Sequence, residues 1–168
     1  MISEAMEKAL NDQMNFELFS AYQYAACAAT MEQANLDGFA HWLSLQVREE
    51  MDHAMKFYRF IMDVGGTVEF SAMAKPECSI EQPQALFENV LEHEREVSAR
   101  IHKLVDLALK ESNHPTNTFL QWFVTEQVEE EKAADDIVQR LKMVGGDKQG
   151  LFMLDLEMAK RAGEPGAA

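Results

Sequence analysis

Four long segments repeat apolar residues at alternating spacings of four and three positions, and this pattern constrains the fold more than any other feature. Three segments cover about residues 4–33, 38–64 and 84–111, and a fourth runs from the turn SNHPT at 112–116 to about residue 144. Such spacing places the apolar residues on one face of an α-helix, as in helices that pack into a bundle. We therefore expect an all-α fold built on four antiparallel helices.

The inward face of each helix can be predicted residue by residue from this spacing. In chain order, the predicted inward residues are Leu10, Met14, Glu17, Ala21, Tyr24, Ala28 and Met31; Phe39, Leu43, Gln46, Glu50, His53, Phe57, Phe60 and Val64; Phe87, Leu91, Glu94, Ser98, Ile101, Val105 and Ala108; and Leu120, Phe123, Gln127, Glu130, Ala134, Ile137, Leu141 and Val144.

The connections predict how the helices are ordered. Short turns at QANLDG (33–38) and SNHPT make helices one and two, and helices three and four, antiparallel neighbours. The middle connection of about 17 residues can run the ~40 Å length of a helix at ~3.3 Å per residue, so it can cross the bundle. Residues 1–146 are then a four-helix bundle, 147–161 a short fifth helix and 162–168 a tail, all in one domain spanning 1–168.

One band of polar residues interrupts the inward faces near the middle of the helices. Glu50 follows Glu17 by 33 positions, and Gln127 follows Glu94 by 33 positions. His53 and Glu130 each lie three positions farther on, where a helical residue faces the same way. The two halves of the chain therefore repeat one design, and we expect these six side chains to meet at one level of the bundle.

A buried layer of this kind needs positive charge. An ionised carboxylate in a dry core costs several kcal/mol unless it is paired, and no Lys or Arg occupies a predicted inward position. The four glutamates carry a charge of −4, which two divalent cations would neutralise. Oxygen ligands with one imidazole suit iron, manganese or zinc better than a soft, thiol-binding metal, and di-iron carboxylate bundles use such a set.

A simpler interpretation has the helices rotated, so that the glutamates face water and His53 is an ordinary hydrogen-bonded core histidine. The apolar residues on both sides of each glutamate argue against it, because they fix the direction of that face.

The amino-acid composition limits the kinds of partner that the protein can bind. Asp and Glu number 29 against 15 Lys and Arg, for a net charge of −14, which repels nucleic acid and anionic membranes and concentrates cations. No apolar stretch approaches the ~20 residues of a membrane span, and the N-terminal sequence MISEAMEKAL does not look like a signal peptide. Cys27 and Cys78 belong to no C-x-x-C pair, which favours reduced thiols and a cytoplasmic location.

The chain resembles the non-haem ferritins, and the bacterial type most closely. The resemblance rests on NDQMNFEL (11–18), REEMDHAMKF (48–57), LEHE (91–94) and above all FLQWFVTEQVEEEK (119–132), in order over about residues 1–160. It implies a homo-oligomeric shell of 24 subunits that oxidises Fe²⁺ with dioxygen and stores the ferric mineral. It also implies that Glu17, Glu50 and His53 bind a first iron, and that Glu50 bridges to a second iron held by Glu94 and Glu130.

Further roles follow from the same resemblance. Gln127 corresponds to a residue near bound dioxygen, and Tyr24 to a tyrosine that can donate one electron, although an inward aromatic can also serve the core alone. A third iron site is implied at Glu49, Glu126, Glu129 and Glu130, while a water-facing acidic surface is the simpler reading of the first three. Trp122 lies off the inward face and is expected to pack in the core or an interface.

No haem is expected. Bacterioferritins bind haem through a methionine at the position of Met51, but they also carry a second Glu-x-x-His on the fourth helix, where this chain has Gln127 and Glu130.

Three other functions remain open at this stage. A di-iron oxidase or peroxidase of the rubrerythrin kind usually adds a Cys-rich iron module, which this sequence lacks. A non-catalytic shell subunit would bind iron without oxidising it quickly. A plain helical interaction domain would take up no stoichiometric metal.

Overall fold

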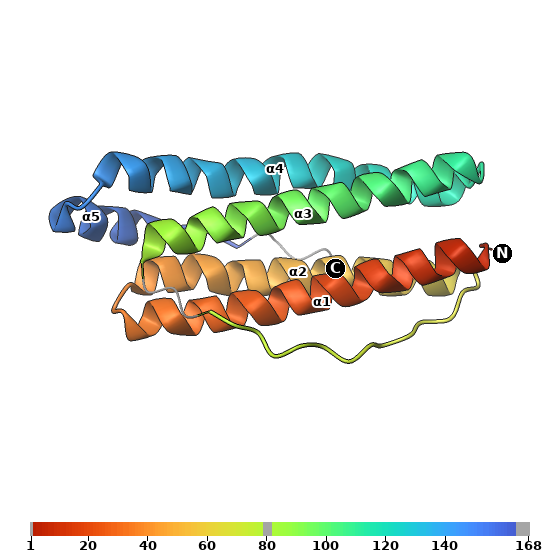
Figure 1. The fold of residues 1–168 in the computed structure, drawn as a ribbon, viewed down its shortest axis with the longest axis horizontal. Coiled ribbons are helices and arrows are strands. Elements are labelled where there is room, and N and C mark those ends of the chain that lie inside the picture. Colours follow the sequence, from red (N-terminus) through yellow and green to blue (C-terminus); the bar gives the residue numbers. More distant parts are fainter. Residues whose placement is uncertain (1, 79–81, 164–168) are drawn as a thin grey trace.

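The computed structural model confirms an all-α bundle with a long crossover and a short fifth helix (Figure 1). Within the residues that the structure describes, 2–78 and 82–163, there are five helices. They are α1 (Glu4–Gln33), α2 (Asp37–Asp63), α3 (Pro83–Lys110), α4 (His114–Val144) and α5 (Lys148–Met158). α1 packs against α2 and α3 against α4, and α5 packs mainly against α2. No helix in the described part of the chain is both long and apolar enough to cross a membrane.

The predicted inward faces are the buried faces. Every predicted inward residue is buried except Phe60, Val64, Val105 and Val144, which lie near helix ends and are half-buried. The apolar core is divided into two clusters, one toward α5 that includes Phe39 and one toward the N-terminus that includes Phe57. The polar layer lies between these two clusters, so the apolar core of the bundle is not continuous.

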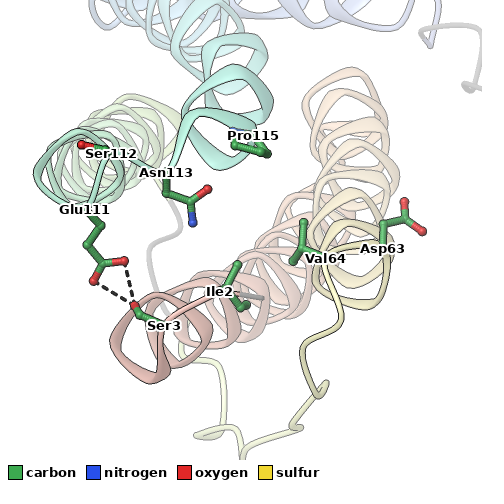
Figure 2. Close-up of a pocket in the computed structure, with 8 residues that line it drawn as sticks. All are labelled: Ile2, Ser3, Asp63, Val64, Glu111, Ser112, Asn113 and Pro115. Atoms are coloured by element: carbon green, nitrogen blue, oxygen red, sulfur yellow. Dashed lines mark hydrogen bonds between the residues drawn. The ribbon is translucent and has the colours of Figure 1, made fainter.

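Side chains at helix starts fix where the helices begin. Ser3 accepts a hydrogen bond from the Met6 amide at 3.0 Å, and Asn113 accepts one from the Thr116 amide at 3.2 Å. Such caps satisfy backbone N–H groups that have no partner within the helix. The Ser3 hydroxyl also donates to Glu111 beside a pocket of about 860 Å³ at the end of the bundle away from α5 (Figure 2).

Residues 67–78, in the crossover between α2 and α3, run along α1 and are held by side chains of that helix (Figure 1). Asn11 donates to a backbone carbonyl of the crossover at 2.8 Å and accepts from a backbone amide at 2.7 Å. Further hydrogen bonds of this kind come from Asn15, Gln23 and Thr30. These side chains thus supply hydrogen-bond partners to backbone groups of the crossover, which has no neighbouring strand among the described residues to pair with them.

Cys27 in α1 and Cys78 in the crossover are free thiols, as expected. Burial raises the pKa of Cys27, and the neighbouring Cys78 thiol raises it further. Cys27 therefore stays protonated and unreactive at neutral pH.

The fifth helix is shorter than the predicted segment 147–161, because it ends at Met158.

Asp155 of α5 is buried and accepts hydrogen bonds from the Gly38 and Phe39 amides at 2.8 and 3.1 Å, so it caps the start of α2. A Cβ on Gly38 would lie 1.8 Å from the Asp155 carbonyl oxygen, so only glycine permits this docking. Beyond α5 the chain turns back along α2, and residues 164–168 of the predicted tail lie outside the described residues.

Candidate metal centre

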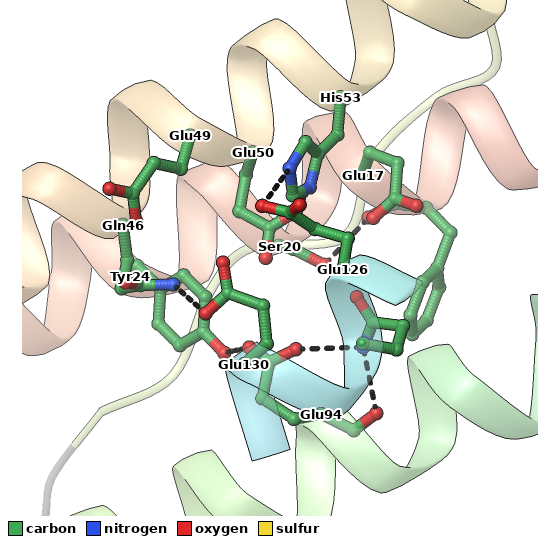
Figure 3. Close-up of polar contacts among 12 residues, drawn as sticks. Glu17, Ser20, Tyr24, Gln46, Glu49, Glu50, His53, Glu94, Glu126 and Glu130 are labelled. Atoms are coloured by element: carbon green, nitrogen blue, oxygen red, sulfur yellow. Dashed lines mark hydrogen bonds and ion pairs between the residues drawn. The ribbon is translucent and has the colours of Figure 1, made fainter. Parts of the chain in front are cut away.

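The six residues of the predicted polar layer are buried between the two apolar clusters, and Figure 3 shows the four acids and the histidine among them pointing toward one another. α1 contributes one, α2 two, α3 one and α4 two. Their exposed fractions lie between 0% and 5%: Glu17, Glu50, His53, Glu94, Gln127 and Glu130. The repeat of 33 positions within each helix pair therefore places four carboxylates and one imidazole in a space almost closed to water.

One group of possible ligands consists of Glu17, Glu50 and His53. A ligand atom from each of these three lies within 4.8 Å of the other two, and His53 Nδ1 is 3.3 Å from Glu50 Oε2. Gln13 donates to one oxygen of Glu17 at 2.9 Å. Within the described chain, the other Glu17 oxygen is buried without a hydrogen-bond donor. An unsatisfied buried carboxylate oxygen is costly, and a bound cation would remove that cost.

A second group consists of His53, Glu126 and Glu130, again within 4.8 Å. His53 Nε2 lies 3.8 Å from Glu126 Oε1, so each nitrogen of the imidazole faces a carboxylate. The ring of Trp122 stands edge-on to His53 at a centroid distance of 5.4 Å. Trp122 thus packs against the centre on one side, while 39% of its surface remains exposed to solvent.

Glu94 belongs to neither group, and each of its oxygens accepts a hydrogen bond from another side chain. The Tyr24 hydroxyl donates to Glu94 Oε1, and Gln127 Nε2 donates to Glu94 Oε2 at 3.2 Å. Both donors are buried. Their hydrogen bonds stabilise the negative charge of the Glu94 carboxylate in the absence of a cation. They also orient this carboxylate toward the centre.

The three other acids of the implied third iron site differ in exposure and in their partners. The Glu49 side chain is 11% exposed and pairs with Arg161, while Glu129 is exposed on α4 and lies in neither group. Glu126 is half-buried and faces His53. Of these three acids, only Glu126 therefore lies among the grouped ligand atoms.

Electrostatics favours protons on the layer when no cation is present. Burial raises the pKa of Glu17 and Glu50, and burial together with Glu94 and Glu49 raises the pKa of Glu130 to about 8. Burial alone would lower the pKa of His53, but hydrogen bonds to Glu126 and Glu50 outweigh it and raise that pKa well above its usual value. A divalent cation that enters the layer must therefore displace protons.

Sequence patterns did not indicate several contacts around the centre. Gln46 donates to Glu130 at 2.9 Å and in turn accepts from Arg161, which lies past α5. His93 is half-buried, hydrogen-bonds Ser20 at 2.7 Å and meets the Tyr24 ring edge-on. Gln46 was predicted to face inward, but no local signal indicates the position of Arg161, because it depends on a turn after the last helix.

The chain is similar to known proteins over most of its length. Residues 7–144 match the family model described as ferritin-like domain. The bacterial non-heme ferritin of Staphylococcus aureus (strain USA300) is 35% identical over 161 residues, covering 96% of this chain and 97% of the relative. The relative of the same name from Staphylococcus haemolyticus is 36% identical over 162 residues, covering 96% and 98%.

Solved structures show the same likeness. The open pore ferritin from the hyperthermophilic archaeon Archaeoglobus fulgidus superposes with a TM-score of 0.95 at 45% identity, covering 96% of this chain and 99% of that chain. A humanized archaeal ferritin superposes with a TM-score of 0.96 at 45% identity, covering 98% and 100%.

Proposed function

Because this chain belongs to the ferritin family, we propose that it is a ferroxidase and an iron-storage protein. It oxidises Fe²⁺ with dioxygen at the centre between α1, α2, α3 and α4, and it stores the ferric product as a mineral inside an oligomeric shell. The observation that carries this function is the buried layer of carboxylates with one imidazole, where no Lys or Arg of the described residues is buried.

Each Fe²⁺ substrate ion has its own ligands in this proposal. Glu17, Glu50 and His53 bind the first ion, which supplies the missing partner of the buried Glu17 oxygen. Glu94 and Glu130 bind the second ion, and Glu50 bridges the two. The four carboxylates then balance the charge of two divalent ions.

The ligand set also drives the chemistry. Carboxylate oxygens are hard donors that favour the more highly charged Fe³⁺. Holding two ions side by side presents two one-electron reductants to one dioxygen molecule, which removes the entropic cost of a three-body encounter. Gln127 donates to Glu94 and so orients a ligand of the second ion beside the space where dioxygen approaches.

In this proposal Tyr24 supplies one electron and gives its phenolic proton to Glu94, and a further Fe²⁺ substrate ion supplies the fourth electron when dioxygen is reduced to water. The buried Tyr24 hydroxyl donates to Glu94, so it touches a ligand of the second ion, and burial followed by the charge of Glu94 raises its pKa and keeps it protonated. In Tyr24→Phe we expect two Fe²⁺ per chain to bind as before, while a tyrosyl-radical signal after oxygen exposure disappears in electron paramagnetic resonance. The same signal in both proteins would assign Tyr24 to packing alone.

Assembly into a shell of 24 subunits, in the cytoplasm, completes the proposal. Phe152, Met153 and Leu156 on α5 are 61%, 59% and 46% exposed, and Phe70 in the crossover is 70% exposed. Large exposed apolar side chains of this kind are typical of surfaces that contact other subunits. The free thiols fit a reducing compartment.

The decisive experiment is an anaerobic Fe²⁺ titration of the purified protein, followed by oxygen exposure and particle sizing. We expect saturation at two tightly bound Fe²⁺ per chain, rapid oxidation and a very large particle. Stoichiometric binding followed by slow oxidation would favour a non-catalytic shell subunit. An absence of stoichiometric binding would reject the metal centre altogether.

A further inference from the structure

The chain beyond α5 places a positive charge at the edge of the metal centre. Arg161 Nη2 donates to Glu49 Oε2 at 2.8 Å, and Arg161 Nη1 donates to Gln46 Oε1 at 2.5 Å. Its guanidinium carbon also lies 4.6 Å from the centroid of the Trp42 ring, and its backbone carbonyl is 3.0 Å from His41 Nε2. The guanidinium is therefore fixed on α2 from several sides.

This contact is well shielded from water and continues into the centre. The Arg161 and Glu49 side chains are 24% and 11% exposed, whereas the other ion pairs between Arg or Lys and acids in the described chain are about half-exposed or more. Gln46 is fully buried and passes the contact on, because its amide nitrogen donates to Glu130 at 2.9 Å. Arg161 thereby fixes the orientation of Gln46, and Gln46 fixes a ligand of the second Fe²⁺.

Arg161 and a third Fe²⁺ would need the same acid. The resemblance to bacterial non-haem ferritins implies that a third ion would use Glu49 together with Glu126, Glu129 and Glu130. The guanidinium binds Glu49 Oε2 through Nη2 with a charge that it never loses, and its Nη1 donates to Gln46. A third ion can bind Glu49 Oε2 only if the hydrogen bond from Arg161 Nη2 breaks.

We propose that Arg161 is a built-in counter-ion that competes with Fe²⁺ for Glu49 and so limits tight binding to two Fe²⁺ per chain. This inference rests on the proposed ferroxidase function, since it assigns the regulation of the same centre. Arg161 acts as a positioning and specificity-determining residue and touches neither substrate ion.

Metal titration of Arg161→Gln tests the proposal without recourse to activity. Under anaerobic conditions, calorimetric titration of the wild-type shell with Fe²⁺ should give two tight sites. The variant should show a third site, which binds Fe²⁺ about tenfold or more tightly than the same position does in the wild type. Arg161→Lys keeps the charge and should restore the limit of two. The matched control is Arg140→Gln, because Arg140 pairs with Glu157 in an exposed ion pair on α4 and α5.

A double variant identifies the acid responsible. Arg161→Gln combined with Glu49→Gln should lose the gained site, while circular dichroism and particle sizing confirm that each variant is folded and assembled. An unchanged two-site isotherm in folded Arg161→Gln, or an equal gain in Arg140→Gln, would overturn the role of Arg161 and leave the proposed function intact. Failure of the wild-type protein to bind two Fe²⁺ would instead reject the proposed function.

Discussion

Replacing Glu50 by leucine is expected to slow Fe²⁺ oxidation by about 100-fold or more and, at the same time, to stabilise the metal-free protein. Glu50 is 2% exposed, lies between Glu17 and His53, and bridges the two ions in our proposal. Without it neither ion is held in place, and small misplacements of reacting groups already cost about 100-fold. Stopped-flow absorbance of Fe³⁺ formation measures the rate.

The stability effect of the same change has the opposite sign. Leucine has a similar volume and removes a carboxylate whose pKa is raised by burial and by the charges of Glu17 and Glu94, so its charged form at pH 8 costs the folded protein on the order of 1 kcal/mol or more. Chemical unfolding of chelator-treated protein at pH 8 measures it. Asp52→Ala, at an exposed position on the same helix, is the control and should change neither quantity. Fast oxidation in the Glu50 variant would remove this residue from the centre.

The stability of the metal-free protein should fall as pH rises from about 4.5 to about 8. Glu130 has a pKa near 8 in the folded protein against 4.5 when unperturbed, so the folded state holds a proton that the unfolded state has released. Each such carboxyl contributes about 1.4 kcal/mol per pH unit within its window. His53 acts in the same direction above its ordinary pKa of 6.5, because its folded-state pKa is also raised.

A bound cation should reverse this trend. Zn²⁺ does not change oxidation state and competes with protons for the same oxygens, so it should raise the thermal midpoint more at pH 8 than at pH 5.5. Differential scanning calorimetry of chelator-treated and Zn²⁺-loaded protein measures both trends. Glu130→Gln should flatten the pH dependence of the metal-free protein. A midpoint that rises with pH in the metal-free wild type would contradict the protonated layer.

The sequence predicted most of the fold because its signals are local and periodic. Helix faces follow from the four-three spacing, and α1 and the end of α4 were placed at the observed residues. The polar layer was predictable for the same reason, since a fixed offset between helices sets a fixed height in the bundle. Phe60 and Val64 are less buried than predicted because the bundle ends there, and periodicity does not report where neighbouring helices stop.

The contacts at the edge of the centre required the structure. Asp155 caps α2 from α5, and Arg161 reaches Glu49 from the chain beyond α5, although more than 110 positions separate the partners in both cases. Neither residue belongs to a motif or to a predicted inward face of the four-helix bundle. Glu94 was correctly predicted in the layer, but its occupation by Tyr24 and Gln127 depends on side-chain directions that spacing does not specify.

The sequence by itself determined four helices, their inward faces and a level at which four acids and one histidine meet, because helical periodicity converts residue number directly into direction and height. Only the tertiary structure decided which oxygens stay without a donor, which acids pair with Arg161, and where α5 docks. Those outcomes depend on distances between side chains from distant parts of the chain, which are set when the helices pack and not by any one of them.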